Sequence, residues 1–195
     1  MTAVGIDLGA SRFHVAVLGE RIEVQVTSEL RDVLDLCAGA SAVAIDAPSE
    51  PATGRVHAGA RSPKFAVARC NEIAAGEELG VWVPWVTPIL DDCPAWMRNG
   101  FRVWEALRSA GHQPMEVYPA GCFWLLNGRR WPPRKTTASG RATRRTLLEP
   151  LAGPLVLDDH DALDAVMAAV VARGPHRAVR HTDPGCDSSS LFVLA

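Results

Sequence analysis

Three short apolar segments of this sequence each carry one acidic residue. They are residues 2–9 (TAVGIDLG) with Asp7, residues 42–46 (AVAID) with Asp46, and residues 114–118 (PMEVY) with Glu116. Short apolar runs bounded by turn residues are typical of buried β-strands. In an α/β protein, ligands and catalytic groups gather at the ends of such strands. The pattern therefore predicts an α/β sheet with acidic side chains at its strand ends.

The remaining segments complete the predicted element order. Residues 12–18 and 21–27 are rich in β-branched residues and indicate a hairpin after the first strand. Helical spacing predicts a helix over 30–39, helical structure over 64–111 with its best helix at 94–110, a helix over about 140–151 and a last helix from about 158. The order β-β-β-α-β-α-β-α, with an extra helical insertion, predicts a central mixed five-stranded sheet flanked by helices. Residues 191–194 are a candidate for a further strand. The 195 residues contain no long linker, so we expect one domain over 1–195.

Composition excludes several classes of protein. The net charge is −2, so any attraction for nucleic acid must come from a local basic patch. The five cysteines are scattered without a Cys-x-x-Cys pair, which argues against a disulfide framework or a structural zinc site and favours reduced thiols. The first residues do not resemble a signal peptide, and no apolar run is long enough to cross a membrane. We therefore expect a cytoplasmic protein without a membrane partner.

A second group of acids lies at the start of the last predicted helix. Asp158 or Asp159 suits the helix N-cap, whereas Asp161 and Asp164 are three residues apart and share a helix face. Each strand acid could by itself be a turn or cap residue. Several carboxylates meeting in one place repel one another, however, and a divalent cation relieves that repulsion. Oxygen ligands without cysteine or histidine favour Mg²⁺ or Mn²⁺ over zinc. We expect Asp7, Asp161 and at least one of Asp46 and Glu116 to converge.

These motifs, taken in order, resemble one known family. They are GID at 5–7, IDAP at 45–48, EVYP at 116–119, Lys135-Thr136, the Gly-Arg-x-x-Arg-x-x-Leu-Leu segment at 140–148, and HDALDA at 160–165. The family is domain of unknown function 429, described as predicted RNase H-like nucleases. The resemblance implies an RNase H-like fold and metal-dependent phosphodiester hydrolysis on DNA or RNA. It assigns catalytic and metal-binding roles to Asp7, Asp46, Glu116, Asp161 and Asp164. Residues 174–190 match nothing in this pattern.

A basic segment between the third and fourth motifs is the candidate nucleic-acid contact. Residues 129–145 contain seven arginines and lysines, among which Lys135, Arg141 and Arg144 lie in the resembling segment. Such a segment can hold phosphates, or it can simply be a solvated surface. Trp131 lies among the arginines and is the best candidate for stacking on a base, while burial is expected for most of the six tryptophans.

Three further features keep two interpretations each. His160 could shuttle protons or be a surface histidine at a helix start. Residues 69–72 (RCNE) resemble a family element of the Arg-Cys-x-Glu kind, or form an ordinary helix turn. The segment GIDLGAS at 5–11 also resembles the first phosphate loop of actin- and sugar-kinase-like proteins, although the chain is short for two such domains. A nucleotide-binding domain and a non-catalytic RNase H-like binding module therefore remain the alternatives.

Overall fold

The computed structural model describes residues 1–57, 60–181, 186 and 190–195. Its strands are β1 (Ala3–Leu8), β2 (Phe13–Leu18), β3 (Ile22–Thr27), β4 (Ala42–Asp46), β5 (Met115–Val117), β6 (His176–Val179) and β7 (Leu191–Leu194). Its α-helices are α1 (Leu30–Cys37), α2 (Cys70–Leu79), α3 (Ala95–Ser109), α4 (Pro119–Leu126), α5 (Ala138–Ala152) and α6 (His160–Arg173). Two short 3₁₀ turns, Phe65–Val67 and Leu90–Asp92, flank α2 in the sequence.

The strands of the described residues form one mixed sheet in the order β3-β2-β1-β4-β5-β7-β6. The first three strands are antiparallel neighbours, β1, β4, β5 and β7 run parallel, and β6 returns antiparallel to β7. The mixed α/β class predicted from the sequence is confirmed. The sheet is larger than the predicted five strands, because β7 and β6 extend the edge beyond β5. The suggested strand at 191–194 is β7, whereas β6 was not predicted because its sequence, HRAV, is short and mostly exposed.

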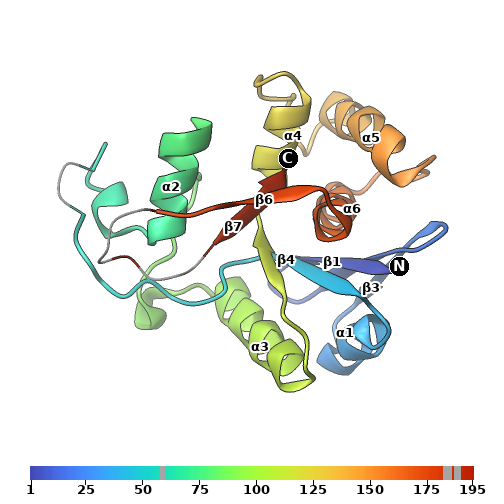
Figure 1. Cartoon of the computed structure of the whole chain (residues 1–195), viewed down its shortest axis with the longest axis horizontal. Coiled ribbons are helices and arrows are strands. Elements are labelled where there is room, and N and C mark those ends of the chain that lie inside the picture. Colours follow the sequence, from blue (N-terminus) through green and yellow to red (C-terminus); the bar gives the residue numbers. More distant parts are fainter. Residues whose placement is uncertain (58–59, 182–185, 187–189) are drawn as a thin grey trace.

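Helices cover both faces of the sheet (Figure 1). One face packs against α6, with α4 and α5 beside it, and the other packs against α1 and α3. Alternate side chains of β1 point to opposite faces of the sheet. Val4, Ile6 and Leu8 pack towards α1 and α3, while Ala3 packs towards α6. Gly5 lies on the α6 side, where a Cβ atom would come within 2.1 Å of the Ala165 carbonyl oxygen. The absence of a side chain at Gly5 thus lets α6 lie directly on β1.

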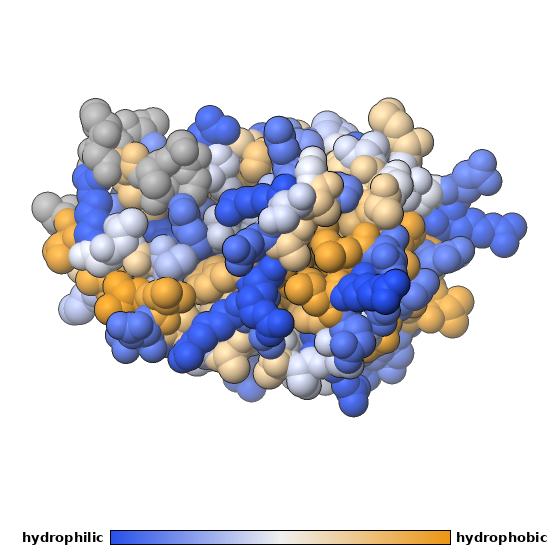
Figure 2. All heavy atoms as spheres, turned by 90° about the horizontal axis from the view of Figure 1, so that it is seen from below, coloured by the Kyte–Doolittle hydropathy of each residue, from blue (hydrophilic) through white to orange (hydrophobic). Residues whose placement is uncertain are grey.

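The helices differ in how much of their surface is buried. Every residue of α6 from Ala162 to Ala172 is buried, which explains its small and mostly apolar sequence. Helix α3 is amphipathic instead, with Val103 and Leu107 buried and Arg102 exposed. Figure 2 shows the molecule from below Figure 1, the side on which α1 and α3 lie, and hydrophilic and hydrophobic side chains are interspersed there. Among the described residues, no helix is both long and apolar enough to cross a membrane.

Helix α2 is joined to the C-terminal part of the chain by a disulfide between Cys70 and Cys186. The expectation of reduced thiols is therefore wrong for this pair, while Cys37, Cys93 and Cys122 are free and buried. The two bonded cysteines are 116 residues apart in the sequence. Spacing arguments recognise local Cys-x-x-Cys patterns and small frameworks, so they did not identify a single long-range pair.

Candidate functional site

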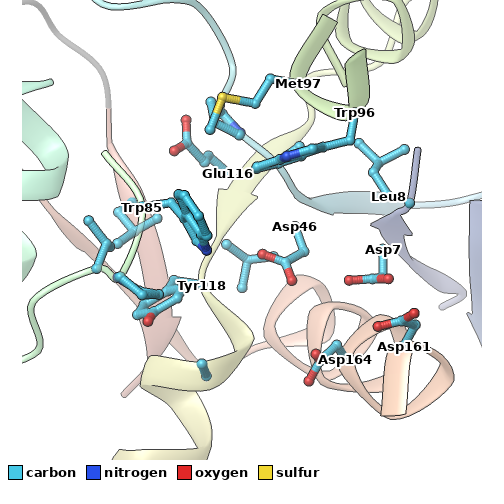
Figure 3. Close-up of a pocket in the computed structure, with 18 of the residues that line it drawn as sticks. Asp7, Leu8, Asp46, Trp85, Trp96, Met97, Glu116, Tyr118, Asp161 and Asp164 are labelled. Atoms are coloured by element: carbon cyan, nitrogen blue, oxygen red, sulfur yellow. The ribbon is translucent and has the colours of Figure 1, made fainter. Parts of the chain in front are cut away.

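Four aspartates from three elements converge on one side of the sheet (Figure 3). Asp7 on β1 and Asp46 on β4 are directly paired across the parallel strands, and both lie on the α6 side of the sheet. The first turns of α6 bring Asp161 and Asp164 over the same strand ends. Carboxylate oxygens of Asp7, Asp46 and Asp164 all lie within 4.8 Å of one another. Asp7 and Asp161 have oxygens within the same distance, so the expected convergence is confirmed.

The sheet and α6 set the geometry of this acid cluster, which we define as Asp7, Asp46, Asp161 and Asp164. The side chain of Asp159 caps α6 by accepting from the Asp161 backbone N–H at 2.9 Å, as predicted for one of the two preceding acids. With the helix start fixed there, residues 161 and 164 project from one face towards β1 and β4. The close approach of α6 at Gly5 then holds the two pairs of acids at contact distance.

Burial and mutual repulsion keep protons on part of the cluster. Burial raises the pKa of Asp7 well above its ordinary value, and the charges of Asp46, Asp164 and Asp161 raise it further. Burial, followed by the charge of Asp164, raises the pKa of Asp46 to about 7, although a hydrogen bond with Asp7 partly opposes the shift. Without a bound metal ion, the acid cluster therefore keeps part of its protons near neutral pH.

Two basic side chains already contact the cluster. Lys135 donates from Nζ to Asp164 Oδ2 at 2.8 Å and to Asp161 Oδ1 at 3.2 Å. Arg144 is buried and donates from Nη1 to Asp164 Oδ1 at 2.5 Å, with its guanidinium over the ring of Phe123. Asp164 is thus the most neutralised of the four acids, while its remaining lone pairs can still accept. Asp7 and Asp46 are less neutralised, because Lys135 and Arg144 donate to Asp161 and Asp164 instead.

A histidine that the sequence analysis did not select faces the same cluster. His14 on β2 pairs with Asp7 across the antiparallel strands and is buried. Its Nε2 lies 3.3 Å from Asp159, whereas its buried Nδ1 has no hydrogen-bond partner and lies 3.9 Å from Asp7 Oδ2. One ring nitrogen of His14 is within 4.8 Å of both Asp7 and Asp161. Its position in an otherwise apolar strand was the available signal, but only the hairpin register places it opposite Asp7.

The structure does not bring Glu116 into the acid cluster. Glu116 pairs with Ile45, one residue before Asp46. Its side chain therefore projects from the face of the sheet opposite to that of Asp46. Its carboxylate accepts from Arg69 Nη1 at 2.9 Å, from Arg69 Nη2, and from the Ser49 backbone N–H at 2.9 Å. The expectation that Glu116 is a metal ligand is therefore corrected: a buried arginine neutralises it. The costly lone buried glutamate that suggested a metal has this structural partner instead.

The segment resembling the family element Arg-Cys-x-Glu belongs to the same buried network. Arg69 is the N-cap residue of α2, and its backbone N–H donates to Glu72 at 3.1 Å, which is the ordinary helix turn of one interpretation. The Arg69 guanidinium also links Glu72 to Glu116. Glu72 in turn accepts the backbone N–H of Thr87 at 3.0 Å. The segment thus connects α2, β5 and the loop before α3 through buried charges.

One cavity of about 570 Å³ contains both the acid cluster and an apolar wall. The wall includes the rings of Trp85, Trp96 and Tyr118, which lie beside Asp46 in Figure 3. Glu116 also lines the cavity, on the side away from Asp7, Asp161 and Asp164 (Figure 3). Trp85 leaves 76% of its surface exposed. The site therefore offers charged oxygens and flat apolar rings to the same ligand.

The predicted nucleic-acid contacts are placed differently. Arg144 is buried on Asp164, so its assignment to a surface phosphate contact is corrected, and Lys135 is engaged with the acids. Arg141 is paired with the exposed Asp158 at 3.0 Å. Trp131 is exposed, as expected, but it packs near Trp124 and is not part of the cavity lining. Within the basic segment, Lys135, Arg141 and Arg144 are thus each paired with an acidic side chain of the protein.

His160 is adjacent to the cluster without entering it. Its Nδ1 lies 2.6 Å from Asp161 Oδ1, and the side chain is partly exposed. Both earlier interpretations of His160 are compatible with this position, because it contacts one of the acids while sitting at the helix start.

Comparison with known proteins agrees with the family resemblance. The family described as "Protein of unknown function (DUF429)" matches residues 94–184, which include the EVYP and HDALDA motifs. The resemblance inferred from the motifs is thereby confirmed. No curated protein sequence matches the chain.

Two solved structures are similar to this chain. The Thermus thermophilus RuvC structure covers 87% of this chain and 92% of its own, at 13% identity and a TM-score of 0.47. T. thermophilus RuvC in complex with a Holliday junction substrate covers 89% and 95%, at 16% identity and a TM-score of 0.41.

Proposed function

We propose that this protein is a divalent-metal-dependent nuclease that hydrolyses phosphodiester bonds in nucleic acid. The observation that carries the proposal is the convergence of Asp7, Asp46 and Asp164, with Asp161 beside them, at one end of the cavity. Clustered carboxylates at strand ends are a costly arrangement unless a cation uses them. The family resemblance supports the same chemistry.

The residues present fit Mg²⁺ or Mn²⁺. The donors are carboxylate oxygens, which hard divalent cations prefer. Burial, and then the charges of the neighbouring acids, raise the pKa values of Asp7 and Asp46, and Lys135 offsets this only in part. The buried Nδ1 of His14 also lacks a partner beside Asp7. Asp7, Asp46 and Asp164, with Asp161 beside Asp7, would hold the cation, which when bound supplies Lewis-acid activation of the phosphodiester and of water.

The remaining polar residues of the site have positioning roles in this proposal. Arg144 fixes Asp164 from within the core. Lys135 links Asp161 to Asp164 and adds positive charge where a phosphate would approach. His14 can accept or return a proton at Nδ1, beside Asp7.

The test is a cleavage assay of the full chain with Mg²⁺ or Mn²⁺ on single-stranded and double-stranded DNA, RNA and hybrid substrates. We expect cleavage of at least one substrate, abolished by EDTA and by Asp7→Asn or Asp161→Asn. The matched control is Asp91→Asn, because Asp91 is exposed and outside the cavity lining. Absence of cleavage for all substrates with both metals would overturn the proposal. Equal activity of the Asp7→Asn and parent proteins would do the same.

A further inference from the structure

The loop that carries the exposed ring of Trp85 is anchored at the edge of the cavity. An indole exposed over 76% of its surface could be a mobile surface side chain. Here the backbone on both sides of it is fixed. Lys64 donates from Nζ to the carbonyl oxygens of Val83, at 3.1 Å, and of Pro84. On the other side, the buried Thr87 donates its backbone N–H and its hydroxyl to Glu72.

This anchoring reaches the core of the molecule. Glu72 is bound by Arg69, and Arg69 also holds Glu116 on β5, the strand next to Asp46 on β4. The Trp85 loop and the strands that carry the acids are therefore connected by buried ion pairs. Trp96, at the start of α3, and Tyr118, after β5, complete the wall around the same space (Figure 3). Three rings from separate segments thus face one cavity whose other end is the acid cluster.

We infer that the aromatic wall formed by Trp85, Trp96 and Tyr118 is a subsite for an unpaired nucleobase, and that the substrate is single-stranded nucleic acid or an extruded nucleotide. This inference rests on the proposed nuclease function, because it takes the phosphodiester to lie at the acid cluster. A base joined to that phosphodiester lies within one nucleotide of it, and the wall adjoins Asp46 in the same cavity.

Size and chemistry favour this occupant. Cavities that take small ligands are about 300–1,000 Å³, and this one, at about 570 Å³, suits one nucleotide. Bases within a duplex have both faces covered by their neighbours, so only an unstacked base can offer a face to Trp85. Stacking on aromatic rings is tolerant of base identity, which agrees with a wall that is mostly apolar.

The experiment measures binding rather than cleavage. A short fluorescently labelled single strand, as DNA and as RNA, its duplex, and a sugar-phosphate strand without bases are titrated with the protein in Ca²⁺. Fluorescence anisotropy reports the Kd, and gels check that the strands stay intact. The variants are Trp85→Ala and Trp85→Phe. The control is Trp131→Ala, which alters another exposed tryptophan that does not line the cavity.

We expect Trp85→Ala to weaken single-strand binding about 5- to 150-fold, the range for losing one stacked base. Trp85→Phe should retain most of the affinity, and Trp131→Ala should leave it unchanged. The strand without bases should bind the parent and Trp85→Ala proteins equally. The inference is overturned if Trp85→Ala binds the single strand as the parent does, or if it loses affinity equally for the strand without bases.

The two proposals fail in different ways. If no substrate is cleaved but base-dependent binding through Trp85 persists, the nuclease function is wrong and the base subsite stands. If cleavage occurs and Trp85→Ala changes neither the Kd nor the KM for single strands, the base subsite is wrong and the nuclease function stands. Circular dichroism of each variant shows that the fold is retained before either conclusion is drawn.

Discussion

At Asp7, a metal-binding role and a purely structural role predict opposite effects of substitution on stability. Its raised pKa favours the protonated form, in which it can donate a hydrogen bond to Asp46. Asparagine has nearly the same shape and also donates, so Asp7→Asn should remove repulsion without removing a contact. We predict that the metal-free variant is as stable as the parent or more stable by roughly 0.5–2 kcal/mol, against the usual destabilising trend. Urea denaturation in EDTA measures this difference.

The response to metal provides the second half of the Asp7 test. A ligand that binds only the folded state stabilises it by RT ln(1 + [L]/Kd). Millimolar Mn²⁺ should therefore raise the Tm of the parent and raise that of Asp7→Asn much less. Equal metal-induced shifts in the two proteins would exclude Asp7 as a ligand. A capping role would instead make the asparagine variant neutral or less stable in EDTA.

Lys135 offers a complementary prediction with the opposite sign. Burial by itself lowers the pKa of Lys135, but the charges of Asp164, Asp7 and Asp161 raise it by a larger amount. The pKa is therefore raised overall, and the side chain stays protonated. Lys135→Gln removes this charge from Asp161 and Asp164. We predict a loss of about 1–3 kcal/mol in the metal-free protein, the range for hydrogen bonds to charged groups at a partly exposed site. The control is Arg134→Gln, because Arg134 is an exposed neighbour.

Metal should compensate for the loss of Lys135. A bound cation replaces the missing positive charge, so Mn²⁺ should raise the Tm of Lys135→Gln more than that of the parent. Thermal melts of the parent, Lys135→Gln and Arg134→Gln proteins with and without Mn²⁺ measure both effects. A smaller metal-induced shift in Lys135→Gln than in the parent would indicate that the lysine helps to hold the ligands for the metal rather than substituting for it.

The acidic residues also show how far sequence reasoning reaches at this scale. Asp7, Asp161 and at least one of Asp46 and Glu116 were predicted to converge, because strand ends and one helix face bring acids together. Glu116 was assigned to the same group because it lies on a third strand. Strand assignment alone does not fix the face, since a shift of one residue in register reverses it. The pairing of Glu116 with Ile45 decides the outcome, and no local pattern specifies that pairing.

At the scale of elements, the contact between β1 and α6 determines the geometry of the acid cluster. A Cβ atom at residue 5 would lie 2.1 Å from both the Ala165 oxygen and the Ala169 nitrogen, so α6 would have to move away. We predict that Gly5→Ala destabilises the protein by about 3 kcal/mol or more, at the upper end of overpacking effects. The displacement of α6 should also separate Asp161 and Asp164 from Asp7, so Mn²⁺ should no longer raise the Tm.

Gly39→Ala is the matched control for this helix contact. No atom lies within 4 Å of a Cβ built at Gly39, so its effect should stay within about 0.5 kcal/mol. Chemical denaturation gives the stabilities, and melts with Mn²⁺ give the metal response. A Gly5→Ala protein that is as stable as Gly39→Ala and responds to Mn²⁺ like the parent would show that α6 can be displaced without disturbing the site.

The elements themselves were predicted to different degrees. The first strands and α6 follow from clear periodicity and capping residues, and their positions agree with the structure. The additional strand β6 could not be predicted, because an exposed four-residue strand has almost no apolar pattern. The role of Arg69 in joining α2 to β5 was likewise hidden, since its partner Glu116 is 47 residues away. Long-range partners of polar residues depend on packing that the local sequence does not encode.

At the scale of the whole molecule, the acid cluster should leave a signature in the dependence of stability on pH. Burial and the charge of Asp164 raise the pKa of Asp46 to about 7, and burial with neighbouring charges also raises that of Asp7. In the unfolded chain both groups titrate near 4. Between these values the folded protein binds more protons than the unfolded chain, so this contribution to stability is present below about pH 4 and falls as the pH rises through about 7.

Other groups oppose this trend, so the prediction concerns a difference. Hydrogen bonding and the charge of Arg141 lower the pKa of Asp158, which therefore stabilises the fold above its unfolded pKa and loses that effect as the pH falls. Asp46→Asn removes the titration of Asp46 and lessens the upward shift in the pKa of Asp7, since the charge of Asp46 contributes to that shift, while Asp158 is left as it is. We predict that the metal-free parent becomes progressively less stable relative to Asp46→Asn between about pH 4 and 7, and that the difference levels off above that range. Denaturant titrations of both proteins in EDTA across this range measure it.

Metal should reverse the pH dependence. Carboxylates must lose their protons to bind a cation, so the stabilisation of the parent by Mg²⁺ should increase from about pH 5 to about pH 8, where the metal-free parent is weakest relative to Asp46→Asn. Asp46→Asn should show a smaller increase because one titrating ligand is missing. If the metal-induced stabilisation of the parent were the same at both ends of this range, its binding would not require deprotonation of Asp7 and Asp46, and the cation would have to bind elsewhere on the molecule.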